Sequence, residues 1–494
     1  MGNRGSPFLS KTKYLIGLQC PKLLWYNYNA KDKLPPVDAG TQAVFDQGHE
    51  VGRVAQTLFS DGITIGEEAD FKKVINITRS LLEKRKPLFE AGFLYKNTYA
   101  RADILNPVNG GKWDIVEVKS ATNIKDVNYY DVAFQRYCFE GAGVEISRCY
   151  LMYINNRYVR KGDIDQNQLF IKEDITKMLE GYSDAIAGRL NKMCEIIDSK
   201  KCPNVKIGPH CNDPYECVLK PICWEFLPED NIFTLYRIKK TEAFKLLDKG
   251  VLNINDIPDS MEFNARQLIQ RECVRNGKAH IDKTGIMDFL SRLQFPLYFL
   301  DFETFGSAIP PYDNSMPFRQ IPFQFSLHCL ETLDSKPIHH SYLADARKDP
   351  RPEILSRLKE LLGKKGTIIA YNMSFEIGRL KECAEAFPEY QEWAEEVIPR
   401  FMDLLTPFRD FNYYHPSQKG SASIKKIAPP LINKSYKDMD IADGGSASSE
   451  YVRVTFGKVL GSERQRVYEA LLKYCELDTQ VMIDIMRALK KVVS

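Results

Sequence analysis

Two acidic residues, Asp301 and Glu303, follow an apolar run over residues 296–300. The run has the aromatic and aliphatic content of a buried strand, and residues two apart in a strand project to the same face. Two carboxylates on one face repel each other unless water, a cation or a shared proton relieves them. Mg²⁺ and Mn²⁺ take oxygen ligands, so such an ion is a natural partner for the pair. An exposed Asp-x-Glu is also common on polar strands, and the pair alone decides nothing.

Two later segments add further acids and a tyrosine. Glu376 follows a second short apolar segment, 366–370, at the start of a helix-like stretch. Tyr474 and Asp478 lie four residues apart on a strongly helical segment and therefore share one helix face. Four acids from three separate segments suit a two-metal site, in which one ion activates water and the other stabilises the leaving oxygen. Tyr474 could orient the attacking water, or it could be an ordinary core tyrosine.

The order of these residues resembles the DnaQ-like, DEDD-type 3′–5′ exonucleases over about residues 286–494. In that family an Asp-x-Glu opens the first motif, an Asn followed by a Phe and an acid forms the second, and Tyr-x-x-x-Asp forms the third. The resemblance implies an RNase H-like α/β domain. It also implies that Mg²⁺ or Mn²⁺ binds to Asp301, Glu303, Glu376 and Asp478. The family has an aspartate where this chain has Glu376, and the longer side chain could shift a metal.

The first half of the chain carries another acidic pattern. Asp103 lies in an expected strand over 99–105, and Asn109-Gly110 predicts a hairpin turn. A second expected strand, 113–119, places Glu117 and Lys119 on one face, and a helix-like run with Gln135 follows. An acid followed about a dozen residues later by Glu-x-Lys is typical of PD-(D/E)XK nucleases.

Over about residues 8–230 the layout resembles the RecB-like branch of those nucleases. The resemblance implies a mixed sheet flanked by helices, with Mg²⁺ or Mn²⁺ on Asp103 and Glu117. Lys119 would hold the water or offset charge on the phosphate, and Gln135 matches the branch's glutamine. The chain departs from the branch at two positions that bear on whether the site is active. Gly52 and Phe139 stand where the branch has a histidine and a tyrosine.

Several of the twelve cysteines form a pattern of their own. Cys211, Cys217 and Cys223 recur at six-residue steps in a polar segment, Cys202 precedes them, and Cys20 lies far upstream. Spacing alone leaves zinc and an iron–sulfur cluster open, although the short Cys-x-x-Cys of compact zinc sites is missing. The remaining cysteines, Cys475 included, indicate core packing.

The iron–sulfur members of the RecB-like branch, found in CRISPR adaptation and in helicase–nuclease repair complexes, have one cysteine before the nuclease core and three after it. This resemblance implies a 4Fe–4S cluster on Cys20, Cys211, Cys217 and Cys223, with Zn²⁺ as the alternative. Cys202 remains a possible substitute ligand.

The length and composition of the chain indicate how many domains to expect. A chain of 494 residues with 44% hydrophobic and 27% charged residues predicts two or three globular domains. We expect a RecB-like domain over 8–230, a helical connector over 231–285 and an exonuclease domain over 286–494. Residues 443–449, rich in glycine and serine, predict a surface loop. No apolar stretch reaches the roughly 20 residues of a membrane span and no secretory signal is evident, so we expect a cytoplasmic protein.

The combination resembles a prokaryotic two-domain family that joins an iron–sulfur RecB-like nuclease to a DnaQ-like exonuclease. It implies a metal-dependent DNA nuclease that removes nucleotides from 3′ ends in DNA end processing, repair or defence. The partner would be DNA with a single-stranded end, which Tyr413 and Tyr414 could grip by stacking. Two alternatives stay open: an RNA exonuclease, and a nucleic-acid-binding adaptor with one or both sites inactive.

Overall fold

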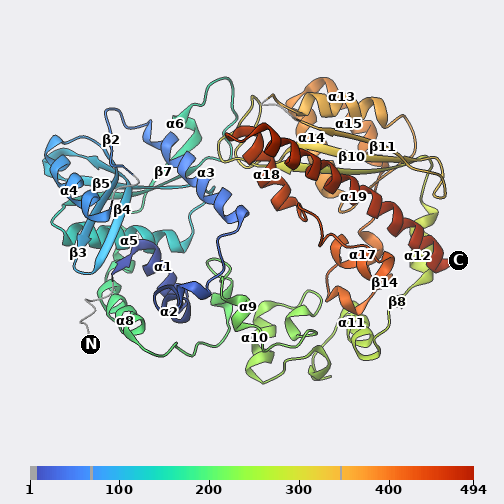
Figure 1. Ribbon diagram of the computed structural model, residues 1–494, viewed down its shortest axis with the longest axis horizontal. Coiled ribbons are helices and arrows are strands. Elements are labelled where there is room, and N and C mark those ends of the chain that lie inside the picture. Colours follow the sequence, from blue (N-terminus) through green and yellow to red (C-terminus); the bar gives the residue numbers. More distant parts are fainter. Residues whose placement is uncertain (1–7, 67–69, 345–347) are drawn as a thin grey trace. The chain divides into compact units, whose positions relative to one another are not determined.

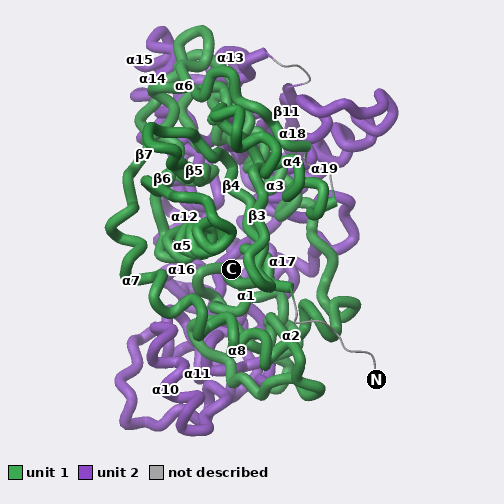
Figure 2. The backbone as a smooth tube through the Cα atoms, turned by 90° about the vertical axis from the view of Figure 1, so that its left-hand side faces the viewer, with its two compact units in different colours: residues 1–226, 307–318 green, residues 227–306, 319–494 purple. Residues whose placement is uncertain are grey.

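The computed structural model describes residues 8–66, 70–344 and 348–494, and the chain divides into two compact units (Figure 2). The first unit comprises Met1–Phe226 and Ser307–Phe318, and the second comprises Leu227–Gly306 and Arg319–Ser494. Both units combine helices with sheets, so the predicted α/β class is confirmed. The segment predicted as a connector, 231–285, groups with the second unit.

A mixed sheet forms the centre of the first unit (Figure 1). Its strands run in the order β2-β3-β4-β5-β6-β7, and β1 pairs with β4. The bounds are β1 (Leu9–Ser10), β2 (Ile63–Thr64), β3 (Leu88–Tyr95), β4 (Thr98–Pro107), β5 (Trp113–Lys119), β6 (Ile146–Ile154) and β7 (Phe170–Asp174). β4 and β5 are antiparallel and meet at the predicted turn, where Gly110 has a φ of 74°. β5 and β6 are parallel, which requires a crossover, and a helix, α5, provides it.

Helices cover both faces of this sheet. They are α1 (Lys11–Gln19), α2 (Pro21–Asn29), α3 (Ala39–Gln56), α4 (Phe71–Leu81), α5 (Asp126–Gly141), α6 (Gln166–Leu169), α7 (Glu180–Ser183), α8 (Ile186–Asp198) and α9 (Lys220–Cys223). Tyr14 of α1 stacks on Phe134 of α5 in the core on one face. On the other face, Val51 of α3 packs with Ile104 and Val116. Because side chains alternate along a strand, the neighbours of Ile104 and Val116 in sequence face α1 and α5.

The sheet of the second unit has the order β11-β10-β9-β12-β13. Its strands are β9 (Leu297–Phe305), β10 (Ile321–Leu330), β11 (Ile338–Leu343), β12 (Thr367–Ala370) and β13 (Phe401–Asp403). β9, β12 and β13 run parallel, whereas β10 is antiparallel to both β9 and β11. A separate short ladder joins β8 (His280–Ile281) to β14 (Tyr413–Tyr414).

Different helices pack on the two faces of this sheet. The helices of the unit are α10 (Lys240–Asp248), α11 (Ala265–Asn276), α12 (Lys283–Ser291), α13 (Arg351–Leu361), α14 (Ser374–Ala386), α15 (Gln391–Val397), α16 (Thr406–Arg409), α17 (Ile424–Ile432), α18 (Gly444–Phe456) and α19 (Gly461–Val493). Leu300 and Phe302 of β9 pack in the core with residues of α13, α14 and α15. The long α19 and α18 contact the opposite face of β9 (Figure 1). Alternation therefore turns Asp301 and Glu303 toward α19.

The start of α18 corrects one expectation. Residues 443–449 were expected to form a loop, but the helix begins at Gly444. The Asp443 carboxylate caps it by accepting hydrogen bonds from the backbone N–H of Ser446 at 2.9 Å and from its hydroxyl at 2.7 Å. An N-terminal cap of this kind stabilises a helix whose first residues have low helix propensity.

Candidate functional site

The acids predicted on β9 meet α19 at one end of the sheet. Cys475 Sγ lies 3.7 Å from Asp301 Oδ2. Ligand atoms of Asp301, Glu303 and Cys475 all lie within 4.8 Å of one another. Cys475 was expected to be a core cysteine, and it is fully buried, but it is also part of the acidic cluster. Asp478, one turn further along α19, interacts electrostatically with Asp301 and Glu303.

Glu376 reaches the same cluster from the first turn of α14. β12 runs parallel to β9, so both strands point toward the same end of the sheet. The chain that leaves β12 therefore passes close to Asp301. Asn372 turns the chain in a left-handed conformation, φ 71°, and its N–H donates to Asp403 Oδ1 at 2.9 Å. Glu376 Oε2 is buried and accepts no hydrogen bond from any described residue. A buried oxygen of this kind is a free ligand for a cation.

The pKa values of the four acids reflect burial, and those of Asp301 and Glu303 also reflect repulsion from other acids of the cluster. Burial, followed by repulsion from Asp478, raises the pKa of Glu303 to about 8. The same causes, with Glu303 and Glu376 added, raise the pKa of Asp301 well above its ordinary value. Burial raises the pKa of Glu376 to about 8, and the nearby Asp403 adds to the effect. Burial raises the pKa of Asp478 to about 6. Each carboxylate therefore carries its charge at a cost that a bound cation would remove.

Tyr474 and Lys425 complete the surroundings of the cluster. Burial and the charge of Asp478 raise the pKa of Tyr474, so its hydroxyl stays protonated. Lys425 Nζ, from α17, lies 5.4 Å from the ring centres of both Tyr474 and Tyr436. Its charge lowers the pKa values of Glu303 and Asp478, so it offsets part of the negative charge. No sequence pattern indicated Lys425, because a lysine on an amphipathic helix has no distinctive spacing.

Asp403, Tyr413 and Tyr414 make contacts within the protein that hold the local structure. Asp403 Oδ1 accepts hydrogen bonds from the backbone N–H groups of Asn372 and Leu405, at 2.9 and 3.0 Å. Tyr413 and Tyr414 are buried, and Tyr414 stacks on Phe411. The expectation that these two tyrosines grip a nucleic-acid strand is wrong, because buried rings have no face for a base.

The acidic residues of the first unit form a closed network of ion pairs. Glu117 Oε1 accepts from Lys11 Nζ and Lys119 Nζ, both at 2.7 Å, and Oε2 accepts from Gln135 Nε2 at 2.7 Å. Asp131 of α5 accepts from Lys119 Nζ at 2.6 Å and from Gln135 Nε2 at 2.9 Å. Lys11 Nζ also lies 3.4 Å from Asp131 Oδ1. Two lysines thus neutralise two buried carboxylates.

Asp103 lies beside this network. Its Oδ2 accepts a hydrogen bond from the N–H of Val118 at 2.7 Å, and burial together with Glu117 raises its pKa to about 7. The structure therefore brings together the four predicted residues, Asp103, Glu117, Lys119 and Gln135. Asp131 was missed, although it lies one helical turn before Gln135. Lys11 lies on α1, too distant in sequence for any pattern to show it.

Phe139 and Gly52, the two departures from the RecB-like pattern, both lie within helices of the first unit. Phe139 is fully buried and its ring lies 4.6 Å from that of Phe93. Gly52 lies within α3, and a Cβ there would meet no atom within 4 Å among the described residues. His49 of the same helix is exposed. None of these side chains contributes to the ion-pair network.

The four cysteines predicted as cofactor ligands line one cavity. Cys20, Cys211, Cys217 and Cys223 surround a space of about 280 Å³, which includes solvent-facing volume. Gln19 Nε2 donates to the carbonyls of His210 and Tyr215, at 2.9 and 2.7 Å, and so ties the end of α1 to the cysteine segment. Burial, with Cys20 and Cys211 adding to it, raises the pKa of Cys217 to about 11. Cys202 does not line the cavity.

The spacing of these sulfur atoms bears on the choice of cofactor. In a tetrahedral zinc site with Zn–S bonds of about 2.3 Å, the sulfurs lie about 3.8 Å apart. Within the described part of the chain, no three of these sulfurs lie within 4.8 Å of one another. A 4Fe–4S cluster is larger than a single ion and keeps its four sulfurs farther apart. The cysteine sulfurs therefore do not stand at the spacing of a tetrahedral zinc site.

The family comparison concerns mainly the second unit. A family model described as "Domain of unknown function (DUF2779)" matches residues 298–423, which include β9 and Glu376. The uncharacterized protein UU173 of Ureaplasma parvum is 29% identical over 243 residues, covering 44% of this chain and 34% of that protein. The uncharacterized protein MG366 homolog of Mycoplasma pneumoniae is 27% identical over 267 residues, covering 48% of this chain and 39% of that protein. The matched region thus spans well under half the length of these relatives.

Among solved structures, the crystal structure of SSO0001 is similar to 46% of this chain and 90% of its own, at 13% identity and a TM-score of 0.24. A likeness of this size carries no information on the fold. Over the described residues, no helix combines the length and apolar character that a membrane crossing requires.

Proposed function

We propose that the carboxylate cluster of the second unit binds two Mg²⁺ or Mn²⁺ ions and hydrolyses DNA from its 3′ end. One observation carries the proposal: four acids, Asp301, Glu303, Glu376 and Asp478, are buried close together. Burial raises the pKa of each, and repulsion from other acids of the cluster adds to it for Asp301 and Glu303. The described residues around them include one nearby lysine, Lys425, as counter-charge. Two divalent cations would neutralise the excess charge and would supply an activated water and a stabilised leaving oxygen.

The residues around the acids have roles that fit this reaction. Tyr474 keeps its proton and can donate a hydrogen bond to a water or to a phosphate oxygen. Lys425 Nζ lies beside the tyrosine rings and donates to the carbonyl of Ala442. Among the described residues it forms no ion pair, so its charge can attract the phosphate backbone. The substrate would be DNA with a single-stranded end, and the setting would be DNA end processing, repair or defence in the cytoplasm. RNA remains the alternative substrate.

The first unit supports a weaker case for catalysis. Metal binding at Asp103 and Glu117 requires the ion pair between Glu117 and either Lys11 or Lys119 to break. The closed ion-pair network therefore favours a second candidate, in which this unit holds DNA and the second unit cuts it. If the first site does cut, Lys119 would hold the attacking water. For Cys20, Cys211, Cys217 and Cys223 we propose a 4Fe–4S cluster, with Zn²⁺ as the alternative.

Digestion assays test these assignments. Labelled single- and double-stranded DNA and RNA would be incubated with Mn²⁺ and with wild-type, Asp301→Ala or Lys119→Ala protein. We expect Asp301→Ala to abolish cleavage of DNA and Lys119→Ala to leave it largely intact. Preference for RNA would select the alternative substrate. Cleavage that Asp301→Ala does not affect would contradict the assignment of catalysis to the second unit.

A further inference from the structure

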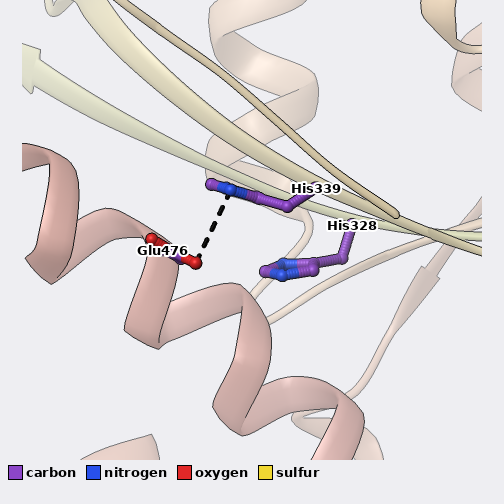
Figure 3. Close-up of side chains that lie close together, drawn as sticks. All are labelled: His328, His339 and Glu476. Carbon is purple, nitrogen blue, oxygen red and sulfur yellow. Dashed lines mark ion pairs between the residues drawn. The ribbon is translucent and has the colours of Figure 1, made fainter. Parts of the chain in front are cut away.

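A second cluster of metal-ligand side chains is formed by His328, His339 and Glu476 (Figure 3). Strand register places His328 on the same face of the sheet as Asp301. His328 of β10 and His339 of β11 are direct partners across the two strands, and their rings stack with centroids 4.4 Å apart. Glu476 comes from α19, and its Oε1 lies 3.6 Å from His339 Nδ1. One ligand atom from each of the three residues lies within 4.8 Å of the others.

Hydroxyl groups orient the ring nitrogens of both histidines. Thr479 Oγ1 lies 2.8 Å from His328 Nδ1, and Ser326 Oγ lies 3.0 Å from His339 Nε2. With one placement of the protons, all of the contacts around the two rings are hydrogen bonds. Each of these ring nitrogens donates to its hydroxyl, Ser326 donates to Thr479 across 2.7 Å, and Thr479 donates to the carbonyl of Glu476 at 3.1 Å.

This placement leaves a lone pair on His328 Nε2 and another on His339 Nδ1. Burial lowers the pKa of His328 to about 4 and also lowers that of His339, so both rings are neutral at pH 7. Histidines that bind metals are usually held in this way, with the other ring nitrogen hydrogen-bonded to the protein. The network therefore presents two neutral imidazoles beside one carboxylate.

We propose that His328, His339 and Glu476 bind one divalent transition-metal ion, with Zn²⁺ as the natural candidate. Two imidazoles and a carboxylate are ligands that zinc accepts, with a water in the fourth position. The two rings stack with their planes 25° apart, whereas a shared ion would lie in the plane of each ring. Binding therefore requires His339, the less buried ring, to turn toward the ion.

An ion at this place would connect α19 to the edge strand of the sheet. Glu476 lies between Tyr474 and Asp478 on α19, while His339 lies on β11 at the end of the strand order. The site is separate from the carboxylate cluster, and the proposal does not depend on nuclease activity.

Zinc stoichiometry in matched variants tests the site. Wild-type protein, His339→Ala, Glu476→Gln and the control His340→Ala would be titrated with Zn²⁺ and analysed for bound metal. His340 is the next residue on β11, and its cross-strand partner, Leu327, packs in the core on the other face of the sheet. We expect His339→Ala and Glu476→Gln each to bind one equivalent of Zn²⁺ fewer than wild type, and His340→Ala to match wild type.

Nitrogen NMR of the seven histidines identifies the ligand atoms. With ¹⁵N-labelled histidine, Zn²⁺ should shift His328 Nε2 and His339 Nδ1 and leave His340 unchanged. Wild-type stoichiometry in folded Glu476→Gln protein, or histidine resonances that do not respond to Zn²⁺, would overturn the proposal. Loss of DNA cleavage in Asp301→Ala with this zinc equivalent retained would confirm that the two sites are independent.

Discussion

At the scale of single residues, the two acidic clusters differ in how their charges are balanced. Glu117 and Asp131 are each bonded to Lys119, and Lys11 lies against both. Although burial raises the pKa of Asp131, the two lysines lower it below its ordinary value. In the other cluster burial and repulsion between the acids outweigh the charge of Lys425, and the pKa of Glu303 rises to about 8. The second cluster therefore has more to gain from a bound cation.

The raised pKa of Glu303 predicts how the metal-free protein responds to pH. A folded-state pKa above the unfolded value of about 4.3 contributes stability below that value, and the contribution is lost as pH rises toward 8. With EDTA, we expect the thermal midpoint to fall between pH 5 and pH 8, and Mn²⁺ to reverse the fall.

Glu303→Gln isolates this effect. It removes a buried charge, so we expect the metal-free variant at pH 8 to unfold at a midpoint at least about 2 °C above wild type. It should also gain less from Mn²⁺. Glu469→Gln on the exposed side of α19 is the control and should change neither value. A lower midpoint for Glu303→Gln in EDTA would show that the carboxylate is held by protein contacts instead.

The ion pairs of the first unit predict a different result for Lys11→Met. Removing this lysine leaves Glu117 and Asp131 with one neutralising partner, at a cost of about 1.5–3 kcal/mol in the free energy of unfolding. Urea unfolding measures the loss. If the site can bind metal, Mg²⁺ should restore more stability to Lys11→Met than to wild type. Lys13→Met, whose lysine bonds to Asn27, is the control and should show no such response to Mg²⁺.

Sequence patterns could predict residues whose spacing repeats a strand or helix period, but not partners that arrive from elsewhere. Asp301 with Glu303 and Tyr474 with Asp478 were predicted as pairs on shared faces, and the structure brings all four together. Lys425 comes from another helix and has no periodic relation to them. Cys475 was interpreted as core because a buried thiol in an apolar helix looks the same whether or not acids surround it.

At the scale of elements, parallel strands explain why distant acids meet. β9 and β12 run parallel, and Ile369 near the end of β12 pairs with Phe299 of β9, so the residues that follow β12 lie level with the acids of β9. The turn after β12 depends on Asn372, whose positive φ is a conformation that asparagine and glycine adopt more readily than other residues. This turn sets the start of α14 and hence the place of Glu376.

Substitutions at Asn372 test the turn. Asn372→Ala forces an alanine into the left-handed region, and we expect a loss of about 1–2 kcal/mol in the free energy of unfolding. Asn372→Gly should retain near wild-type stability, because glycine has no Cβ to clash. Equal stability of the two variants by urea unfolding would contradict this account of the turn.

Element boundaries were less predictable where composition and capping disagree. The glycine- and serine-rich residues 443–449 predicted a loop, but Asp443 caps a helix that starts there. By contrast, the strands over 99–105 and 113–119 and the turn between them are confirmed, because β-periodicity and Asn-Gly turn chemistry agree.

At the scale of the whole molecule, the chain does not divide strictly by sequence order. Residues 307–318 follow β9 of the second unit but belong to the first. Arg160 Nη1 donates to the carbonyls of Pro310 and Pro311, at 3.0 and 2.8 Å, and Ala308 packs in the core of the first unit. No composition change marks this exchange, so the predicted boundary at residue 286 could not show it.

The iron–sulfur cluster proposed for the cysteine cavity should be visible in the intact protein. Anaerobically purified protein should be brown, with broad visible absorption, and Cys217→Ser should lose most of that absorption. Cys202→Ser should keep it, because Cys202 does not line the cavity. Colourless wild-type protein that contains zinc would replace the iron–sulfur assignment.

The central claim is that the cluster around Asp301 cuts DNA from the 3′ end. The most direct test follows 5′-labelled single-stranded DNA with Mn²⁺ on a sequencing gel. For the wild type we predict a ladder that shortens from the 3′ end and releases mononucleotides, with Tyr474→Phe strongly slowed and Asp301→Ala inactive. An Asp301→Ala protein that folds normally and yields the same ladder would contradict the claim.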